Sequence, residues 1–110
     1  IDDSTIRGNN SKKAVELLKE LLVNKVYLLN YTPKIGIIGE DGVERGCLYG
    51  VDMPPDDEFV VRGRTEEEIN EKIGVETHFL SVEAMLRGSG RAGMDRENLC
   101  FFCIGGKKPF

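Results

Sequence analysis

The chain opens with Ile1-Asp2-Asp3-Ser4-Thr5-Ile6-Arg7-Gly8-Asn9-Asn10-Ser11. Adjacent carboxylates can accept hydrogen bonds from ribose hydroxyls, directly or through a hydrated Mg²⁺. Gly8 lets the backbone approach a ligand closely, and the amide groups of a helix that starts near Ser11 can face an anion. The stretch therefore predicts a site for a ribose 5-phosphate. On spacing alone, a plain turn followed by a helix cap is an equal alternative.

Helix and strand signals follow this loop in turn. Apolar residues recur at helical spacing from Ala14 to Leu22, and Asn10 or Ser11 can cap that helix. Val26 to Leu29 then predicts a mostly buried strand. From Pro33 to Gly46 the repeated glycines predict a hairpin-like excursion with an exposed tip. A loop, a helix and a strand in this order are half of an α/β unit.

Two more helices are expected in the second half of the chain. Thr65-Glu66-Glu67-Glu68 has the pattern of a capping box and predicts a helix that ends near Gly74. Ser81 is expected to cap a second short helix, with Gly88 closing it. Residues 87–93 are then interpreted as a glycine-rich connection.

Composition limits the function classes. The chain of 110 residues has 40% hydrophobic and 31% charged residues, which is typical of one globular domain. Its net charge of -4 gives no field that would attract nucleic acid. No apolar run reaches the roughly 20 residues of a membrane span, so a cytoplasmic location without membrane contact is expected. The chain starts at Ile1, on a motif that should follow a buried strand, and we expect further residues upstream.

Three cysteines form an odd set without a secretory signature: Cys47, Cys100 and Cys103. This usage favours metal or redox chemistry over a disulfide framework. Two thiolates within one turn suit zinc, an iron-sulfur cluster or a redox disulfide. The alternative is that the cysteines only fill an apolar core.

The acidic loop resembles the signature of type I phosphoribosyltransferases, and more narrowly the Asp-Asp-Ser-Ile-Val-Arg-Gly-Thr-Thr-Ser form of the amidophosphoribosyltransferase family. Asn9 and Asn10 stand where that form has threonines, which leaves backbone contacts to phosphate and removes two hydroxyls. The segment around the first cysteine is similar to Cys-Phe-Tyr-Gly-Ile-Asp of the cluster-containing members, and it reads Gly46-Cys47-Leu48-Tyr49-Gly50-Val51-Asp52. The pair Cys100 and Cys103 resembles their C-terminal Cys-x-x-Cys. Lys34 to Arg45 is the least similar part and is expected to be a surface insertion.

The resemblance implies an α/β fold: the C-terminal part of a type I phosphoribosyltransferase domain plus a mainly helical C-terminal extension. Residues 1–32 would end the phosphoribosyltransferase core, and residues 33–110 would carry the cysteine ligands. Three cysteines would bind a structural 4Fe-4S cluster whose fourth ligand lies outside this chain: Cys47, Cys100 and Cys103. Asp2 and Asp3 would also hold Mg²⁺. The loop as a whole would bind phosphoribosyl pyrophosphate through Asp2, Asp3, Ser4, Thr5, Ile6, Arg7, Gly8, Asn9, Asn10 and Ser11.

The function implied is the first step of de novo purine biosynthesis, in which ammonia from glutamine and phosphoribosyl pyrophosphate give phosphoribosylamine. Members of this family are homo-oligomers inhibited by purine nucleotides. The chain would be a C-terminal fragment, inactive alone, because the glutamine amidotransferase part would belong to the missing N-terminal part of the protein. Two alternatives remain: another type I phosphoribosyltransferase of salvage or pyrimidine metabolism, and a non-enzymatic nucleotide-binding regulatory module.

Overall fold

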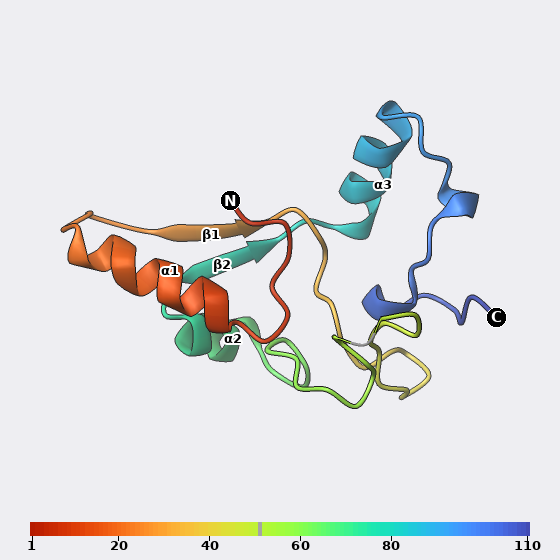
Figure 1. Ribbon diagram of the computed structural model, residues 1–110, viewed down its shortest axis with the longest axis horizontal. Helices are drawn as coiled ribbons and strands as arrows, with labels where there is room; N and C mark the ends of the chain where they lie inside the picture. Colours follow the sequence, from red (N-terminus) through yellow and green to blue (C-terminus); the bar gives the residue numbers. More distant parts are fainter. Residues whose placement is uncertain (51) are drawn as a thin grey trace.

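A computed structural model describes residues 1–50 and 52–110 of the protein (Figure 1). Val51, in the segment around the first cysteine, lies outside the described residues. The expected α/β class is confirmed. In chain order the helices, strands and short 3-10 helices are α1 (Asn9–Glu20), β1 (Tyr27–Asn30), α2 (Glu66–Ile73), β2 (Glu76–Phe79), α3 (Val82–Arg91), η1 (Arg96–Asn98) and η2 (Phe102–Ile104).

The two strands pair in parallel, with Tyr27 opposite Glu76 and Asn30 opposite Phe79. One sheet therefore contains residues from both sides of position 32, where the phosphoribosyltransferase core was expected to end. Helices α1 and α2 lie beneath the same face of this sheet in Figure 1 and contact each other. The buried core between these layers consists of Val15, Val60, Val61, Ile69 and Ile73.

The prediction that the first strand is mostly buried is wrong. Leu28 and Asn30 face the helices, whereas Tyr27 and Leu29 are 50% and 43% exposed on the opposite face. Alternate side chains of a strand point to opposite faces, and the described residues cover only one face of this sheet. The apolar run predicts the strand, but it does not show how many faces of the sheet are covered.

The start of the chain lies against the free edge of β1. The amide of Asp2 donates to the carbonyl of Leu29 at 2.9 Å, and the amide of Tyr31 donates to the carbonyl of Asp2 at 3.0 Å. This parallel bridge pairs Asp2 with Asn30. The acidic loop thus leaves the sheet at the carboxyl ends of the strands, which is where open parallel sheets bind ligands.

The first helix begins in a different way from the expected one. Its N-cap is Gly8, with φ 84°, and no side chain caps it. The prediction that Asn10 or Ser11 caps the helix is wrong, because both lie inside its first turn. A left-handed glycine turns the chain directly into the helix. The side chain of Ser11 is instead buried and lies 3.4 Å from the hydroxyl of Thr5.

The capping box of α2 is confirmed. The amide of Glu68 donates to the hydroxyl of Thr65 at 3.3 Å, and the carboxylate of Glu68 accepts from the amide of Thr65 at 2.8 Å. The helix ends at Gly74, whose φ is 94°. Both ends of α2 therefore follow from local sequence.

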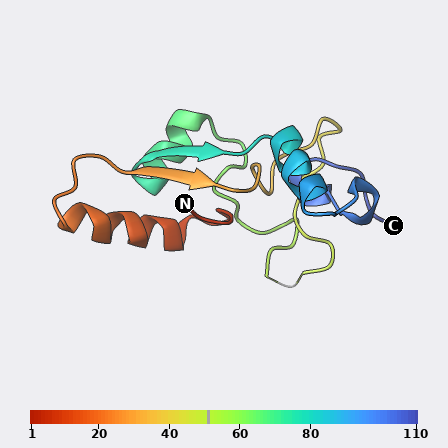
Figure 2. The same cartoon turned by 90° about the horizontal axis from the view of Figure 1, so that it is seen from above.

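The third helix is longer than expected. Ser81 caps it as predicted, with its hydroxyl accepting from the amide of Ala84 at 3.1 Å. Gly88 does not close the helix, which continues to Arg91, so the predicted connection over residues 87–93 is wrong. The helix includes both Gly88 and Gly90, each of which costs a helix about 1 kcal/mol. Figures 1 and 2 both place α3 and the C-terminal residues at the end of the molecule opposite to the far end of α1.

The hairpin-like excursion is confirmed at its tip. Ile38 and Glu44 form an antiparallel bridge, and residues 40–44 are exposed. Arg45 departs from the expected surface insertion because its side chain is only 5% exposed. It packs 4.7 Å above the ring of Phe102 and bonds to Asp41 at 3.1 Å. The hydrogen bond from this guanidinium, followed by that from the amide of Val43, lowers the pKa of Asp41.

Within residues 1–50 and 52–110, no helix combines the length and the apolar character that crossing a membrane requires.

Two glycine variants separate crowding from backbone strain. Gly36 has φ 86°, and a Cβ there would overlap the ring of buried Phe59, whereas Gly42 has φ 75° and open space around it. We expect Gly36→Ala to lower the free energy of unfolding by about 3 kcal/mol, from strain plus overpacking, and Gly42→Ala by about 1 kcal/mol, from strain alone. Urea unfolding of both variants measures the difference. Equal losses would contradict the crowding at Gly36.

Candidate functional site

The acidic loop encloses a pocket of about 460 Å³. The structure brings all the predicted phosphoribosyl pyrophosphate residues to its wall: Asp2, Asp3, Ser4, Thr5, Ile6, Arg7, Gly8, Asn9, Asn10 and Ser11. The wall consists of the loop and the first turn of α1. We call this cavity the loop pocket.

A buried polar network holds the first half of the loop on the sheet. The hydroxyl of Thr5 donates to Asn30 Oδ1 at 2.6 Å, and Asn30 Nδ2 donates to the carbonyl of His78 at 3.2 Å. Thr5, Ser11 and Asn30 are all buried. Because buried polar groups are costly unless bonded, this network fixes the loop relative to both strands and α1.

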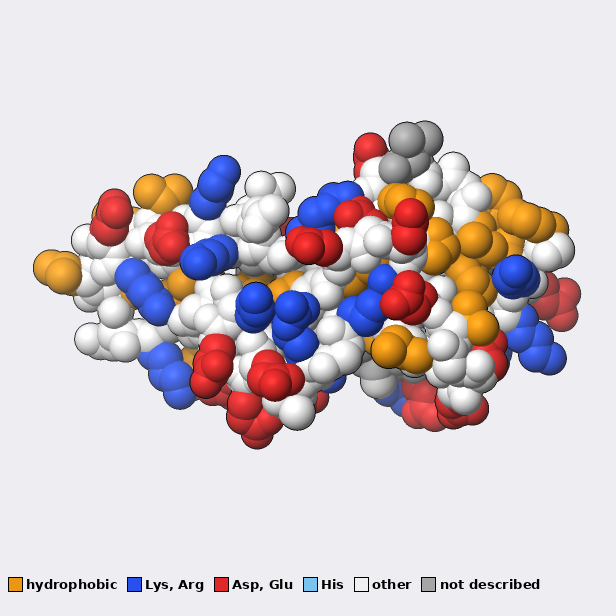
Figure 3. Space-filling model, turned by 90° about the horizontal axis from the view of Figure 1, so that it is seen from below, with side chains coloured by type: hydrophobic (Ala, Val, Ile, Leu, Met, Phe, Trp, Pro, Cys, Tyr) orange, Lys and Arg blue, Asp and Glu red, His pale blue; other side chains and the backbone are white. Residues whose placement is uncertain are grey.

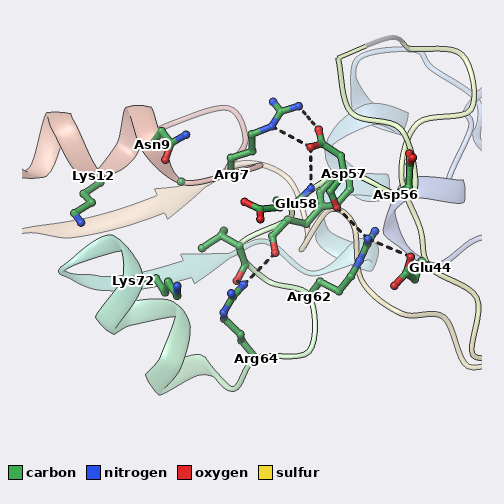
Figure 4. A pocket seen from close by; sticks show the side chains of 13 residues that line it. Arg7, Asn9, Lys12, Glu44, Asp56, Asp57, Glu58, Arg62, Arg64 and Lys72 are labelled. Carbon is green, nitrogen blue, oxygen red and sulfur yellow. Dashed lines mark hydrogen bonds and ion pairs between the residues drawn. The ribbon is translucent and has the colours of Figure 1, made fainter.

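A distant segment holds the second half of the loop. The amide of Val60 donates to the carbonyl of Ile6 at 2.8 Å. The guanidinium of Arg7 forms an ion pair with Asp57 (Figure 4). It also donates to the carbonyl of Asp52. The sequence did not reveal these contacts, since Arg7 and Asp57 are fifty positions apart and no local pattern connects them.

The carboxylates of Asp2 and Asp3 each accept a hydrogen bond from the amide of the next residue. Asp2 Oδ1 accepts from the amide of Asp3 at 2.9 Å, and Asp3 Oδ1 accepts from the amide of Ser4 at 2.7 Å. The second oxygen of each carboxylate has no hydrogen-bond donor among the described residues. Free carboxylate oxygens in the wall of the loop pocket can accept hydrogen bonds from ribose hydroxyls or coordinate Mg²⁺.

The first turn of α1 supplies donors for an anion. Its first main-chain bond runs from the amide of Lys12 to the carbonyl of Gly8 at 2.9 Å, so the amides of residues 9–11 have no partner within the helix. Asn9 and Asn10 are exposed there. Contacts from these main-chain amides to a phosphate would not depend on which side chains stand at positions 9 and 10.

Cys103 lies in η2, and Cys100 precedes this short helix. Burial raises the pKa of the Cys103 thiol, and electrostatic interaction with Cys100 and Cys47 raises it further. The amide of Gly50 also donates to the sulfur of Cys47 at 3.1 Å. Across residues 1–50 and 52–110, however, no three Cys, His, Asp or Glu side chains are arranged so that they could hold a metal ion. The three thiols therefore form no coordination site among the described residues.

No protein-family model matches the chain, but individual proteins do. The amidophosphoribosyltransferases of Methanocaldococcus jannaschii and Bacillus subtilis are each 34% identical to it over 99% of its length. A solved structure described as glutamine phosphoribosylpyrophosphate amidotransferase from B. subtilis, complexed with ADP and GMP, covers 96% of the chain at a TM-score of 0.76 and 32% identity. Amidophosphoribosyltransferases are homologues of this chain.

The similarity concerns one part of these homologues. The chain spans 21% of the M. jannaschii amidophosphoribosyltransferase and 22% of the B. subtilis protein. A second solved structure, described as the allosteric regulatory enzyme of purine biosynthesis, is 33% identical with a TM-score of 0.76, and the chain covers 22% of it. The family resemblance inferred from the acidic loop and its surroundings is confirmed over nearly the whole chain.

Two threonines test the polar network under the loop. Thr5→Val removes the donor to Asn30 and leaves a buried acceptor unpaired, so we expect the free energy of unfolding to fall by about 1–3 kcal/mol. Thr32 Oγ1 is buried without a hydrogen-bond partner among the described residues, so Thr32→Val should be neutral or stabilising. Urea unfolding compares the two. A loss with Thr32→Val as large as that with Thr5→Val would contradict the role of the network.

Proposed function

We propose that this chain forms part of an amidophosphoribosyltransferase, which transfers ammonia from glutamine onto C1 of phosphoribosyl pyrophosphate in purine biosynthesis. The observation that carries this proposal is that Asp2 to Ser11 enclose one pocket in a chain homologous to such enzymes. Because the chain spans about a fifth of its homologues, glutamine hydrolysis is assigned to residues outside it.

In this proposal the loop positions the sugar and stabilises charge. The free amides of residues 9–11 anchor the 5-phosphate, and the carboxylates of Asp2 and Asp3 accept hydrogen bonds from the ribose hydroxyls. As the bond from C1 to pyrophosphate breaks, positive charge builds at C1 beside these carboxylates and is stabilised by them. Ammonia then bonds to C1 and loses a proton, and pyrophosphate leaves with the electron pair. Mg²⁺, when bound by Asp2 and Asp3, would neutralise charge on the pyrophosphate.

The cysteines are proposed as ligands of a structural iron-sulfur cluster. The support is the soft donor set, the electrostatic interaction of Cys47 and Cys100 with Cys103, and the amide that bonds to the sulfur of Cys47. A 4Fe-4S cluster normally takes four thiolates, so one ligand would come from outside these residues. The side chains would also have to turn toward a common centre, because they do not form a metal-holding group as they lie.

Purine nucleotides are proposed as inhibitors of the enzyme that bind in the loop pocket. The B. subtilis homologue was solved with ADP and GMP, and the phosphate of such a nucleotide presents the same group as ribose 5-phosphate. Assembly into a homo-oligomer and a cytoplasmic location stay predictions.

Binding of phosphoribosyl pyrophosphate to the chain in the presence of Mg²⁺ tests the proposed function. We expect Asp2→Asn and Asp3→Asn each to weaken binding about tenfold, because a charge-assisted hydrogen bond or metal contact is lost. Asp95→Asn is the control, since Asp95 is exposed and makes no side-chain cap. Isothermal titration calorimetry measures all three. Undiminished binding by both loop variants, or an equal loss with Asp95→Asn, would overturn the assignment of the loop pocket.

Anaerobic reconstitution tests the cluster separately. With iron, sulfide and a small thiol as the fourth ligand, the chain should retain about four iron atoms and an equal amount of sulfide. Cys47→Ser, Cys100→Ser and Cys103→Ser should each reduce the bound iron, whereas His78→Gln, which changes the only histidine, should not. Iron and sulfide analysis after desalting gives the result. Full retention of iron by any of the cysteine variants would remove that residue from the ligand set.

A further inference from the structure

Arg7 is the only cation among the described residues that line the loop pocket. A cation beside a predicted phosphate site would ordinarily be assigned to the phosphate. The guanidinium of Arg7 already has protein partners, however: Nε donates to Asp57 Oδ1 at 3.4 Å, and Nη2 pairs with the second oxygen of that carboxylate and donates to the carbonyl of Asp52. Figure 4 shows the side chains of Arg7 and Asp57 facing each other. The charge of Arg7 is thus compensated within the protein.

Asp57 is a fixed partner for this arginine. Its side chain is 20% exposed, against 43% for that of Arg7. Asp57 Oδ1 also accepts from the amide of Glu58 at 2.8 Å, the amide of Asp57 donates to the carbonyl of Pro54 at 3.0 Å, and its carbonyl accepts from Arg62 at 3.2 Å. These bonds fix Asp57 within the connection between β1 and β2. The ion pair therefore ties the acidic loop to that connection.

Asp57 is the middle one of three consecutive acidic residues, and Arg7 pairs with it alone. Asp56 and Glu58 are exposed and form no ion pair among the described residues. Charges of both signs lie among one another across the middle of the molecule in Figure 3. General attraction between opposite charges would not distinguish these three carboxylates. The course of the connection therefore selects Asp57 as the partner.

Three successive residues of the loop contact the connection. The carbonyl of Ile6 accepts from the amide of Val60 at 2.8 Å. Arg7 makes the one charged contact, through Asp57. Gly8 lies against Val60, because a Cβ at Gly8 would be 3.4 Å from that side chain. Gly8 is also the N-cap of α1, so the ion pair acts directly before the helix amides that are proposed to bind phosphate.

We propose that Asp57 is a positioning residue that holds the second half of the acidic loop, through Arg7, in the shape that binds phosphoribosyl pyrophosphate. Arg7 then serves as the link to Asp57 and not as a phosphate ligand. A loop that is ordered before the ligand arrives binds it more tightly, because binding no longer bears the cost of ordering. The ligand rests on the proposed function, whereas the link between loop and connection is independent of it.

A double-mutant cycle on ligand binding tests this role. Calorimetric titration with phosphoribosyl pyrophosphate and Mg²⁺ should show that Asp57→Asn and Arg7→Gln each weaken the affinity about fivefold, and that the double variant loses no more than Arg7→Gln. Asp57→Glu keeps the charge and should lose less. Asp56→Asn is the matched control and should bind as the unaltered chain does. Additive losses, a loss with Arg7→Gln but not with Asp57→Asn, or an equal loss with Asp56→Asn would overturn the proposal.

Hydrogen exchange tests the link without any ligand, because the amide of Val60 bonds to the loop at Ile6. We expect this amide to exchange about fivefold faster in Asp57→Asn and in Arg7→Gln, with the amide of Ala84 in α3 unchanged. Unchanged exchange at Val60, or equal acceleration at both amides, would overturn the proposal. If the unaltered chain fails to bind phosphoribosyl pyrophosphate while exchange at Val60 responds as expected, the proposed function fails and the link stands.

Discussion

The parallel pairing of β1 with β2 shapes the rest of this molecule. Two parallel strands cannot be joined by a tight turn, so the chain must cross from the carboxyl end of the first strand to the start of the second. Residues 31–75 make that crossing, and α2 is the only regular helix among those of them that the structure describes, which are all except 51. The crossing carries residues 52–64 past the acidic loop, where they supply the contacts to Ile6 and Arg7. The connection therefore holds the second half of the acidic loop in place.

In much of that connection, backbone carbonyls accept hydrogen bonds from arginine side chains and not from a helix or sheet. Arg62 donates to the carbonyls of Gly36, Arg45 and Pro55, which lie in three successive segments of the connection. Backbone carbonyls outside helices and sheets need partners when they are buried, and a guanidinium offers five donors in a fixed plane. One residue thus gathers three irregular segments, and the loop pocket rests on the result through Asp57, which pairs with Arg7.

Sequence reasoning succeeded where the information is local. The capping box at Thr65, the cap at Ser81 and the exposed tip around Asp41 each depend on a few adjacent residues. The loop pocket was predictable for the same reason, because its wall is one continuous stretch and the helix that follows it. Gly88 misled because α3 continues through it and through Gly90 to Arg91, although glycine disfavours a helix. Contacts between distant segments, such as Arg7 with Asp57, leave no periodicity or motif that could predict them.

The uncovered face of the sheet has a consequence for the behaviour of the chain in solution. Parallel sheets are normally covered on both faces, yet Tyr27 and Leu29 face outward here. Charged neighbours offset this apolar surface: Lys25 lies 4.6 Å above the ring of Tyr27 and 3.6 Å from Glu76, and Glu76 also contacts His78 at 2.9 Å. Salt screens such exposed charges, and sulfate or phosphate salts strengthen apolar association. The colloidal stability of the chain therefore depends on ionic conditions, with self-association favoured in concentrated sulfate and opposed in dilute buffer.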